Sequence, residues 1–348
     1  MGRNGNPDWR MPAEWEPHSR TWMAWPCHRA LLDSLGAERA FRGWAAVANA
    51  IAGFEPVAMV VPTGQAETAR AYLLEDITLY EAALGDSWMR DFGPTFVLDE
   101  SGALGAVDWT FNGWGGRTFP EGAANALIGA FVAEESGAMR IPSKLVNEGG
   151  GIHTDGEGTV LLTESVQLNP NRNPSWSRVD IETEVHARLG TEKAIWLKGG
   201  LHADAGFWGT DGHVDTLAAF VKPGVIVAHH QPDPNHPDYH ATRDNIAILE
   251  SETDAHGRSL EVIPVTAPQE RFCDGEPLAC SYINFYYANG AVILCAFGDP
   301  QDAVTTGVFA ELHPDREIVS VPATVIFEGG GGVHCITQQE PVSARKEA

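Results

Sequence analysis

The chain repeats one short sequence: EGGGIH at residues 148–153 returns as EGGGGVH at residues 328–334. Further polar clusters occur at similar intervals. The steps from Asp91 to Glu148, His213, Asn284 and Cys335 are 57, 65, 71 and 51 residues. A spacing of about 60 predicts one supersecondary unit used about five times, each with a polar end facing a shared centre. The alternative is a chance recurrence of turn motifs in a doubly wound sheet.

Apolar runs rich in β-branched residues alternate with amphipathic segments, a pattern typical of an α/β protein. We expect buried strands at 56–62, 159–164, 224–230, 290–297 and 317–327. We expect helices at 31–52, 122–136, 178–189, 239–250 and 300–312. No linker or low-complexity stretch divides the chain, so residues 1–348 are expected to form one catalytic domain, with frayed ends at 1–10 and 342–348.

The composition is that of a globular protein, with 43% apolar and 20% charged residues in a chain of 348. The formal net charge is −24. A surface of this sign repels nucleic acid and anionic lipid, and it mildly favours a cationic ligand. We therefore expect no nucleic-acid partner and no membrane partner. A homodimer is allowed for, although the sequence does not specify an oligomeric state.

The sequence lacks the usual signals of export. No apolar run approaches the roughly 18 residues that a membrane-spanning helix needs. The first 20 residues are polar, without the apolar segment of a signal peptide. The cysteines, at 27, 273, 280, 295 and 335, are odd in number and form no CxxC pair. This usage favours a reduced, cytoplasmic protein without a disulfide framework or a thiolate zinc site.

Cys335 follows four consecutive glycines, which allow another molecule to approach the backbone closely. Such a thiol is either a nucleophile or a buried core side chain. His213 is the leading candidate for a general acid–base, because imidazole titrates near neutral pH. If residues 213–215 form a strand, His213 and Asp215 point into one pocket and Val214 points into the core. Otherwise His213 is an ordinary surface or core histidine.

Asp91 and Glu148 complete a set of three carboxylates with Asp215. Each also has an ordinary interpretation: Asp91 as a turn residue paired with Arg90, and Glu148 as the last residue of a strand. Trp88 either walls an apolar pocket or fills the core. Three carboxylates around a thiol and an imidazole suit a guanidinium, whose N–H groups they match with charge-assisted hydrogen bonds. They suit a peptide carbonyl or a phosphate poorly. A bound cation would in turn favour the thiolate form of the cysteine.

Eight long motifs run in order along nearly the whole chain. They are MPAEWEPHSRTWMAWP (11–26), DSWMRDFGPTFV (86–97), FNGWGG (111–116), NEGGGIHTDGEGT (147–159), LNPNRNP (168–174), DGHVD (211–215), SYINFYYANGAVI (281–293) and GGGGVHCITQQ (329–339). Together they resemble the agmatine deiminase family of guanidine-modifying enzymes, which is grouped with the Porphyromonas-type peptidylarginine deiminases. The resemblance implies the pentein fold, a five-bladed α/β propeller with approximate fivefold pseudosymmetry and a central active site.

The resemblance also implies roles for the site residues. Cys335 would attack the guanidinium carbon and form a covalent amidino-thioether as ammonia leaves. His213 would protonate the ammonia and then activate water. Asp91 and Asp215 would hold the guanidinium nitrogens, and Glu148 would support His213 or the substrate. Further substrate contacts are implied for Trp88, Asn284, Gly331 and Gly332. No metal or organic cofactor is expected, because the substrate carries its own charge.

The expected reaction converts agmatine and water to N-carbamoylputrescine and ammonia, a step of putrescine and polyamine biosynthesis. The alternative is another guanidine: free arginine, a methylguanidine, another guanidinoalkyl amine or peptidyl-arginine. Two segments depart from the family pattern. Residues 204–211 lack an acidic Asp-Glu-Thr-like run, which favours a different substrate tail if that run contacts the distal amine. Residues 294–296 read Leu-Cys-Ala where a Val-Pro-Gln-like sequence is usual.

Two other classes of function are less favoured. A metal-dependent hydrolase would have to use His229, His230, His236 and His240 as ligands. Pro237 disfavours a helical turn between the last two of these, so two ligands on one helix face are not expected. A catalytically inactive binding module is disfavoured because the candidate nucleophile, His213 and Asp215 are all present.

Overall fold

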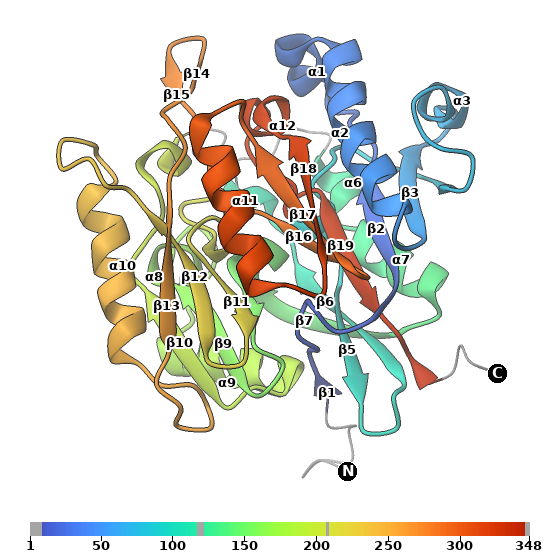
Figure 1. The fold of residues 1–348 in the computed structure, drawn as a ribbon. Coiled ribbons are helices and arrows are strands. Elements are labelled where there is room, and N and C mark those ends of the chain that lie inside the picture. The colour runs from blue at the N-terminus through green and yellow to red at the C-terminus, as the bar shows by residue number, and fades with distance from the viewer. Residues whose placement is uncertain (1–8, 117–121, 207–208, 345–348) are drawn as a thin grey trace.

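The computed structural model describes residues 9–116, 122–206 and 209–344. Within these ranges the chain has the mixed α/β content that its alternating pattern predicts. Figure 1 shows short sheets with the long helices α10 (Tyr239–Ser251) and α11 (Pro300–Leu312) lying along them.

Five sheets share one construction. In each, two strands pair antiparallel, and the second also pairs in parallel with a third strand that is reached through a helix. Sheet by sheet, these strands are β5 (Thr95–Asp99), β6 (Leu104–Thr110) and β7 (Met139–Val146); β8 (His153–Thr154), β9 (Thr159–Thr163) and β10 (Lys193–Leu197); β11 (Ala218–Lys222), β12 (Val225–His230) and β13 (Glu261–Thr266); β16 (Tyr286–Ala288), β17 (Ala291–Ala296) and β18 (Glu317–Pro322); and β19 (Thr337–Pro341), β2 (His18–Ala24) and β3 (Val57–Pro62).

Four further strands lie outside this scheme. β1 (Trp9–Arg10) extends the first sheet beside β5, and β4 (Thr78–Ala82) extends the last one beside β3. A separate hairpin consists of β14 (Phe272–Cys273) and β15 (Glu276–Pro277). The five sheets therefore share the supersecondary unit that the spacing of the polar clusters predicts.

The remaining helices connect these strands. They are α1 (Arg29–Leu35), α2 (Ala37–Ala52), α3 (Ala66–Arg70), α4 (Met89–Phe92), α6 (Gly122–Asn125), α7 (Ile128–Ser136), α8 (Glu164–Gln167), α9 (Arg178–Leu189) and α12 (Thr324–Glu328). Three single 3₁₀ turns are η1 (Gly149–Gly151), η2 (His202–Ala205) and η3 (Val214–Thr216). The segment α5 (Gly113–Gly116) is not a regular helix, because Trp114 adopts φ 52° and Gly115 φ 82°.

Two predicted helices are each broken in two. The segment 31–52 forms α1 and α2, because Gly36 between them adopts φ 79°, outside the helical region. The segment 122–136 forms α6 and α7. The helices predicted at 178–189, 239–250 and 300–312 are confirmed to within one residue.

Four of the five predicted strands are confirmed to within one residue at each end: 56–62, 159–164, 224–230 and 290–297. The fifth prediction, 317–327, is wrong in its second half. The strand ends at Pro322, and residues Thr324–Glu328 form α12. Pro322 has no N–H to donate to a continuing ladder, so the chain leaves the sheet there.

The described parts of the chain ends are held in place, which corrects the prediction of frayed ends. Residues 9–10 pair with β5, and the N–H of Val342 donates to the carbonyl of Pro17. The remainder of that prediction, 1–8 and 345–348, lies outside the described residues. Because β19 pairs with β2, the last strand of the described chain lies in the same sheet as the second strand.

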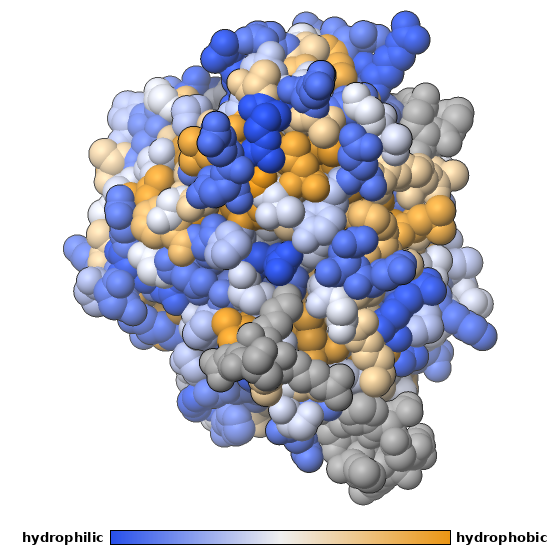
Figure 2. Space-filling view, turned by 90° about the vertical axis from the view of Figure 1, so that its right-hand side faces the viewer, coloured by the Kyte–Doolittle hydropathy of each residue, from blue (hydrophilic) through white to orange (hydrophobic). Residues whose placement is uncertain are grey.

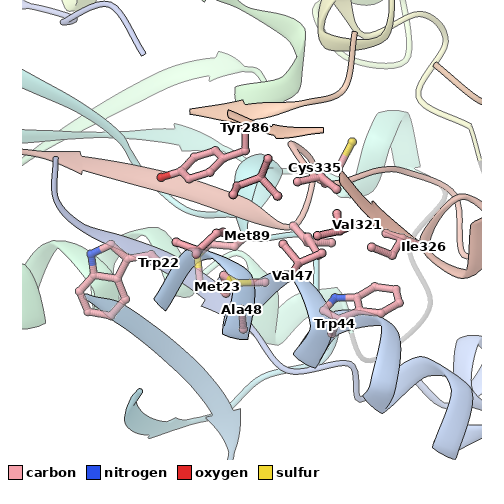
Figure 3. Packing of buried hydrophobic residues seen from close by; sticks show 14 of the residues in the cluster. Trp22, Met23, Trp44, Val47, Ala48, Met89, Tyr286, Val321, Ile326 and Cys335 are labelled. Carbon is pink, nitrogen blue, oxygen red and sulfur yellow. The ribbon is translucent and has the colours of Figure 1, made fainter. Parts of the chain in front are cut away.

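Cys335 lies at the edge of the largest hydrophobic cluster, which packs around α2 and the strands next to it. Figure 3 shows Cys335 at one side of this cluster, with its sulfur pointing away from the other labelled side chains. The residue is 5% exposed. Apolar packing therefore holds the Cys335 backbone, while the thiol faces a different environment.

On the face of the molecule drawn in Figure 2, hydrophilic residues surround separate small apolar areas. Across the described ranges, every helix is too short or too polar to cross a bilayer.

Candidate active site

Each of the five sheets contributes one polar residue to a common site. Asp91 lies in α4 before β5, and Glu148 stands between β7 and η1. His213 precedes η3, and Asn284 lies just before β16. Cys335 lies two residues before β19. Equivalent positions in five similar units thus converge, as the spacing of the polar clusters predicts.

Cys335 presents a protonated thiol. Burial and the nearby carboxylates of Asp215 and Asp91 hold its pKa well above the usual value. The sulfur lies 3.5 Å from Asp215 Oδ2 and accepts a hydrogen bond from Asn284 Nδ2 at 3.2 Å. Its backbone is also held, because the N–H of Arg90 donates to the Cys335 carbonyl at 3.1 Å.

His213 lies between two carboxylates. Its Nδ1 is 3.6 Å from Asp91 Oδ1, and its Nε2 is 3.4 Å from Glu148 Oε2. Burial lowers the pKa of His213, but Asp91 and the hydrogen bond with Glu148 outweigh it and raise the pKa to about 9. At neutral pH the imidazole is therefore cationic and able to donate a proton.

Asp91 is positioned by donors from two other segments. Trp114 Nε1 donates to Oδ2 at 2.8 Å, and the N–H of Gly150 donates to Oδ1 at 3.1 Å. Burial raises the pKa of Asp91 to about 6, with Asp215 adding to the shift and His213 opposing it. Asp91 is thus an anion at neutral pH, close to the range in which it titrates.

Glu148 is held as an anion by Arg172, a residue of the LNPNRNP motif. Arg172 Nε lies 3.0 Å from both Glu148 oxygens, and both side chains are fully buried. Burial raises the pKa of Glu148, but Arg172 and His213 outweigh it, so the pKa is lowered. The other Arg172 nitrogens donate to Asp211 Oδ2 at 3.0 Å and to the Thr210 carbonyl at 2.8 Å. Arg172 thereby links Glu148 to the turn before His213.

Asp215 has one engaged carboxylate oxygen and one without a hydrogen-bond partner among the described residues. Oδ2 lies 2.9 Å from His334 Nδ1, whereas the buried Oδ1 has no hydrogen-bond partner among the described residues. Burial raises the pKa of Asp215, but His334 and His213 outweigh it, so Asp215 stays ionised. His213 Nδ1 is likewise buried without a hydrogen-bond partner in this set. Buried polar atoms of this kind mark a place for ligand groups.

Gly150 leaves the space between these side chains open. A Cβ at this position would lie 2.5 Å from His213 Nδ1, 2.9 Å from Asp215 Oδ2 and 3.0 Å from Asp91 Oδ1. The second glycine turn leaves space open beside the thiol, because a Cβ on Gly331 would lie 3.0 Å from Cys335 Sγ. Each copy of the repeated motif therefore places a glycine where a side chain would fill the site.

A cavity of about 690 Å³ opens onto this cluster. Its described lining includes Cys335, His213, Asp215 and Gly331. Four further carboxylates line the same cavity: Asp204, Asp274, Glu276 and Glu328. This is the size range of small-molecule sites. The acidic lining suits a small cation.

Five of the other predicted site residues do not line the described part of this cavity. Asp91 and Glu148 contact His213 and are not among the described lining residues, and neither are Trp88, Asn284 and Gly332. Trp88 packs edge-on against Trp44, with ring centroids 5.7 Å apart. Asn284 Oδ1 accepts the N–H of His334 at 3.0 Å.

Two interpretations from the sequence need correction. Residues 213–215 are not a strand: His213 precedes η3, which includes Asp215, so both side chains reach the cavity from a tight turn. Val214 is buried as expected. Asp91 is not paired with Arg90, whose guanidinium instead lies 3.3 Å from Glu14.

The four histidines considered as metal ligands do not form a site in the described residues, where no cluster of three or more His, Cys, Asp or Glu could hold a metal ion. His229 instead bonds Ser281 Oγ at 2.9 Å. Burial, with His230 and His236 adding to it, lowers the pKa of His229 to about 3.

Sequence reasoning missed several residues that support the site: Glu14, Trp114, Arg172 and His334. All four lie in motifs that the sequence analysis quoted, so the signal was present. Their partners come from distant segments, and spacing alone does not identify such pairs.

The chain matches the family model of the Porphyromonas-type peptidyl-arginine deiminases over residues 10–341. It is 54% identical over 336 residues to a putative agmatine deiminase of Streptomyces avermitilis, an alignment that covers 95% of this chain and 97% of the relative. It is 41% identical over 355 residues to the agmatine deiminase of Pseudomonas aeruginosa, with 95% of each chain covered.

Solved structures show the same relationship. The agmatine deiminase of Enterococcus faecalis superimposes with a TM-score of 0.90 at 35% identity, covering 96% of both chains. A dimethylarginine dimethylaminohydrolase superimposes with a TM-score of 0.51 at 16% identity over 92% of this chain and 99% of the other, which is a likeness of fold alone. The chain therefore has the fold of the first of these enzymes.

Proposed function

Because the chain belongs to the family of Porphyromonas-type peptidyl-arginine deiminases, we propose that it is an agmatine deiminase, which hydrolyses agmatine to N-carbamoylputrescine and ammonia. The observation that carries the proposal is the juxtaposition of a thiol, a cationic imidazole and a carboxylate with an unpaired oxygen. Cys335, His213 and Asp215 meet at the acidic cavity described above. The product would feed putrescine and polyamine biosynthesis.

The substrate guanidinium would lie against Gly150 and Gly331, where no side chain intervenes. Asp215 Oδ1 and the Asp91 carboxylate would accept its N–H groups, since carboxylates match the fork geometry of a guanidinium. The bound positive charge lowers the pKa of the Cys335 thiol, which two carboxylates otherwise raise. Substrate binding would therefore create the nucleophile, and the contact of Sγ with Asp215 Oδ2 gives the released proton a path.

The first chemical half-reaction forms a carbon–sulfur bond. The Cys335 thiolate attacks the guanidinium carbon, and the electron pair of the C=N bond moves to nitrogen. His213, cationic at neutral pH, donates a proton to the departing nitrogen, which leaves as ammonia. The carbon–nitrogen bond breaks, and a cationic amidino-thioether remains on Cys335.

The second half-reaction reverses these roles. His213, now neutral, takes a proton from water as the oxygen attacks the amidino carbon. The tetrahedral adduct loses its hydroxyl proton as the C=O bond of the ureido product forms and the carbon–sulfur bond breaks, and that proton restores the Cys335 thiol. Glu148 lies on the Nε2 side of the ring and stabilises both the orientation and the charge of His213. No step requires a metal or an organic cofactor.

The five similar sheets support an assignment of the fold of the whole chain. One catalytic domain would extend over residues 1–348 as a pentein, a five-bladed propeller with approximate fivefold pseudosymmetry around this site. Repetition of one strand–strand–helix–strand unit supports it. The free cysteines favour a cytoplasmic location. The charge of −24 favours a small cationic guanidino partner over nucleic acid or a membrane, and a homodimer is the assembly to test.

A different guanidino compound is the second candidate, and one observation favours it. Asp204 accepts hydrogen bonds from Thr210 N, Thr210 Oγ1 and Gly212 N, so its carboxylate serves its own loop. Asp274 and Glu276, in the β14–β15 hairpin, also line this cavity. A longer guanidinoalkyl amine could reach them. Phe207 and Trp208 of the departing segment lie outside the described residues.

The proposal is tested by measuring ammonia and ureido product from agmatine with the purified protein. Cys335→Ser is expected to abolish turnover, whereas Cys27→Ser, a control in a half-buried thiol, should leave it unchanged. Addition of a chelator should also have no effect. Activity retained in Cys335→Ser, or lost with the chelator, would contradict the mechanism. Parallel assays with arginine, methylguanidines and longer guanidinoalkyl amines separate the two candidate substrates.

A further inference from the structure

His334, the residue before the nucleophile, is buried between two carboxylates from opposite ends of the chain. Its Nδ1 lies 2.9 Å from Asp215 Oδ2, and its Nε2 lies 2.9 and 3.1 Å from the two oxygens of Glu14. The three side chains are at most 3% exposed. The ring lines no part of the described cavity wall and thus acts through its neighbours.

The geometry of the ring requires a positive charge. A neutral imidazole has one N–H and one lone pair, and the lone pair would face a carboxylate oxygen at hydrogen-bond distance. Both contacts are favourable only when both nitrogens carry protons. Burial and Arg90 lower the pKa of His334, but Glu14 and Asp215 outweigh them and raise it. The same arrangement holds the pKa of Glu14 well below its usual value.

The other charged groups around His334 also meet at Glu14. Arg90 Nη1 lies 3.3 Å from Glu14 Oε1, and its Nε donates to the His334 carbonyl at 3.3 Å. His153, the last residue of the first copy of the motif, lies 3.9 Å from Glu14, and its ring centroid is 6.4 Å from that of His334. Glu14 is thus the common anion that balances Arg90 and His334.

The contact with His334 determines which oxygen of the Asp215 carboxylate is unpaired. The His334 contact occupies Oδ2, the oxygen that also receives the Cys335 thiol at 3.5 Å. Oδ1 is thereby the oxygen left without a partner among the described residues. Without a donor at position 334, the carboxylate could rotate, and either oxygen could turn toward the thiol.

We propose that His334 is a positioning residue: held as an imidazolium between Glu14 and Asp215, it orients the Asp215 carboxylate so that Oδ1 receives the guanidinium. The KM part of its test rests on the proposed deiminase function. The contact between Asp215 and the thiol does not, because it exists in the free protein. The two parts can therefore fail separately.

The test compares two double variants that differ only in the donor at position 334. Both contain Glu14→Gln, which removes the second carboxylate facing position 334, so that Asp215 is the carboxylate a donor at this position can reach. Paired with His334→Asn, the amide N–H can still donate to Asp215. Paired with His334→Leu, no donor remains. His313→Asn, at a buried histidine that bonds Tyr287 outside the site, is the matched control.

We expect Glu14→Gln/His334→Asn to keep KM for agmatine within about fivefold of the wild type, and Glu14→Gln/His334→Leu to raise it about thirtyfold or more, because misplaced binding groups cost roughly this much. Denaturation midpoints of the two should be similar. Equal KM values in an active, folded pair would overturn the positioning role. A wild-type protein that deiminates no guanidine would instead contradict the proposed function.

A second measurement needs no turnover. Iodoacetamide alkylation of Cys335, followed by mass spectrometry of its peptide, reports the fraction of thiolate. Asp215 without its donor holds the proton of the thiol more strongly, so alkylation should be about fivefold or more slower in the His334→Leu double variant than in the His334→Asn one. Equal alkylation rates would overturn the inference even if agmatine is not the substrate.

Discussion

His213 determines the protonation state of the site at neutral pH. Its two carboxylate neighbours raise its pKa to about 9, whereas burial raises the pKa of Asp91 to about 6. Between these values the imidazole is a cation and Asp91 an anion. This is the state in which one residue can donate a proton and the other can bind a guanidinium.

We therefore expect kcat/KM for agmatine to follow a bell-shaped pH profile with limbs near pH 6 and pH 9. Below the lower limb, protonated Asp91 loses its attraction for the guanidinium. Above the upper limb, neutral His213 cannot protonate the departing ammonia. Steady-state rates from about pH 5 to about pH 10 measure both limbs. In Trp114→Phe, which removes a hydrogen bond that lowers the pKa of Asp91, the lower limb should move to higher pH. A profile without an upper limb would contradict the role of His213.

Arg172 stabilises the ionised form of Glu148, and both side chains are fully buried. Arg172→Met should lower the free energy of unfolding by about 3–5 kcal/mol, because it removes the cation nearest to a fully buried carboxylate. Denaturant titration measures this loss. Arg178→Met removes the exposed partner of Glu164 and should cost about 0–1 kcal/mol. Similar losses in the two variants would show that the Arg172 pair does not stabilise the fold.

At the scale of elements, the two glycine turns shape the site in the same way. The turn at η1 places Gly150 among His213, Asp215 and Asp91, and the turn after α12 places Gly331 against Cys335. The first copy of the motif ends in His153, whereas the second continues into the nucleophile. One local structure thus serves two roles in different units.

Gly150→Ala should lower kcat/KM by about a hundredfold, because the added methyl must displace the side chains that bind and protonate the substrate. Gly307→Ala is the matched control. This glycine lies in α11, and a Cβ added there would meet no heavy atom within 4 Å. The control should keep full activity and gain about 0.5–1 kcal/mol of stability. Normal kinetics in a folded Gly150→Ala would contradict the proposed position of the guanidinium.

At the scale of the whole molecule, the pairing of β19 with β2 joins the last strand of the described chain to its second strand. Glu340 of β19 is fully buried and accepts hydrogen bonds from Trp22 Nε1 and Ser19 Oγ, both at 2.8 Å. Cys335 lies just before this strand, and Glu14 just before β2. Pairing of these strands therefore brings the nucleophile and the anion of the His334 network together.

Glu340→Ala should lower the free energy of unfolding by about 1–3 kcal/mol, because the buried indole N–H of Trp22 loses its acceptor. The shift of the denaturant midpoint measures it. Glu317→Ala, on the exposed end of β18, should change stability by no more than about 0.5 kcal/mol. A Glu340→Ala variant as stable as this control would show that the closing pair contributes little.

The sequence alone determined the α/β class, four of the five strands predicted from it, and the repeated unit, because these depend on local periodicity and on turn residues that recur at similar intervals. The boundaries at Gly36 and Pro322 followed single-residue backbone restrictions that override the surrounding pattern. Cys335, His213 and Asp215 could be selected because thiol, imidazole and carboxylate side chains in glycine-rich turns are chemically distinctive.

Only the tertiary structure decided which charges meet. The pairing of Arg172 with Glu148, and of His334 with both Glu14 and Asp215, joins residues 24, 320 and 119 positions apart. No spacing rule specifies such contacts, since they depend on the way the sheets pack around the site. The protonation states follow from the same packing, because burial and neighbouring charge, not residue type, set the pKa values of Cys335 and His213.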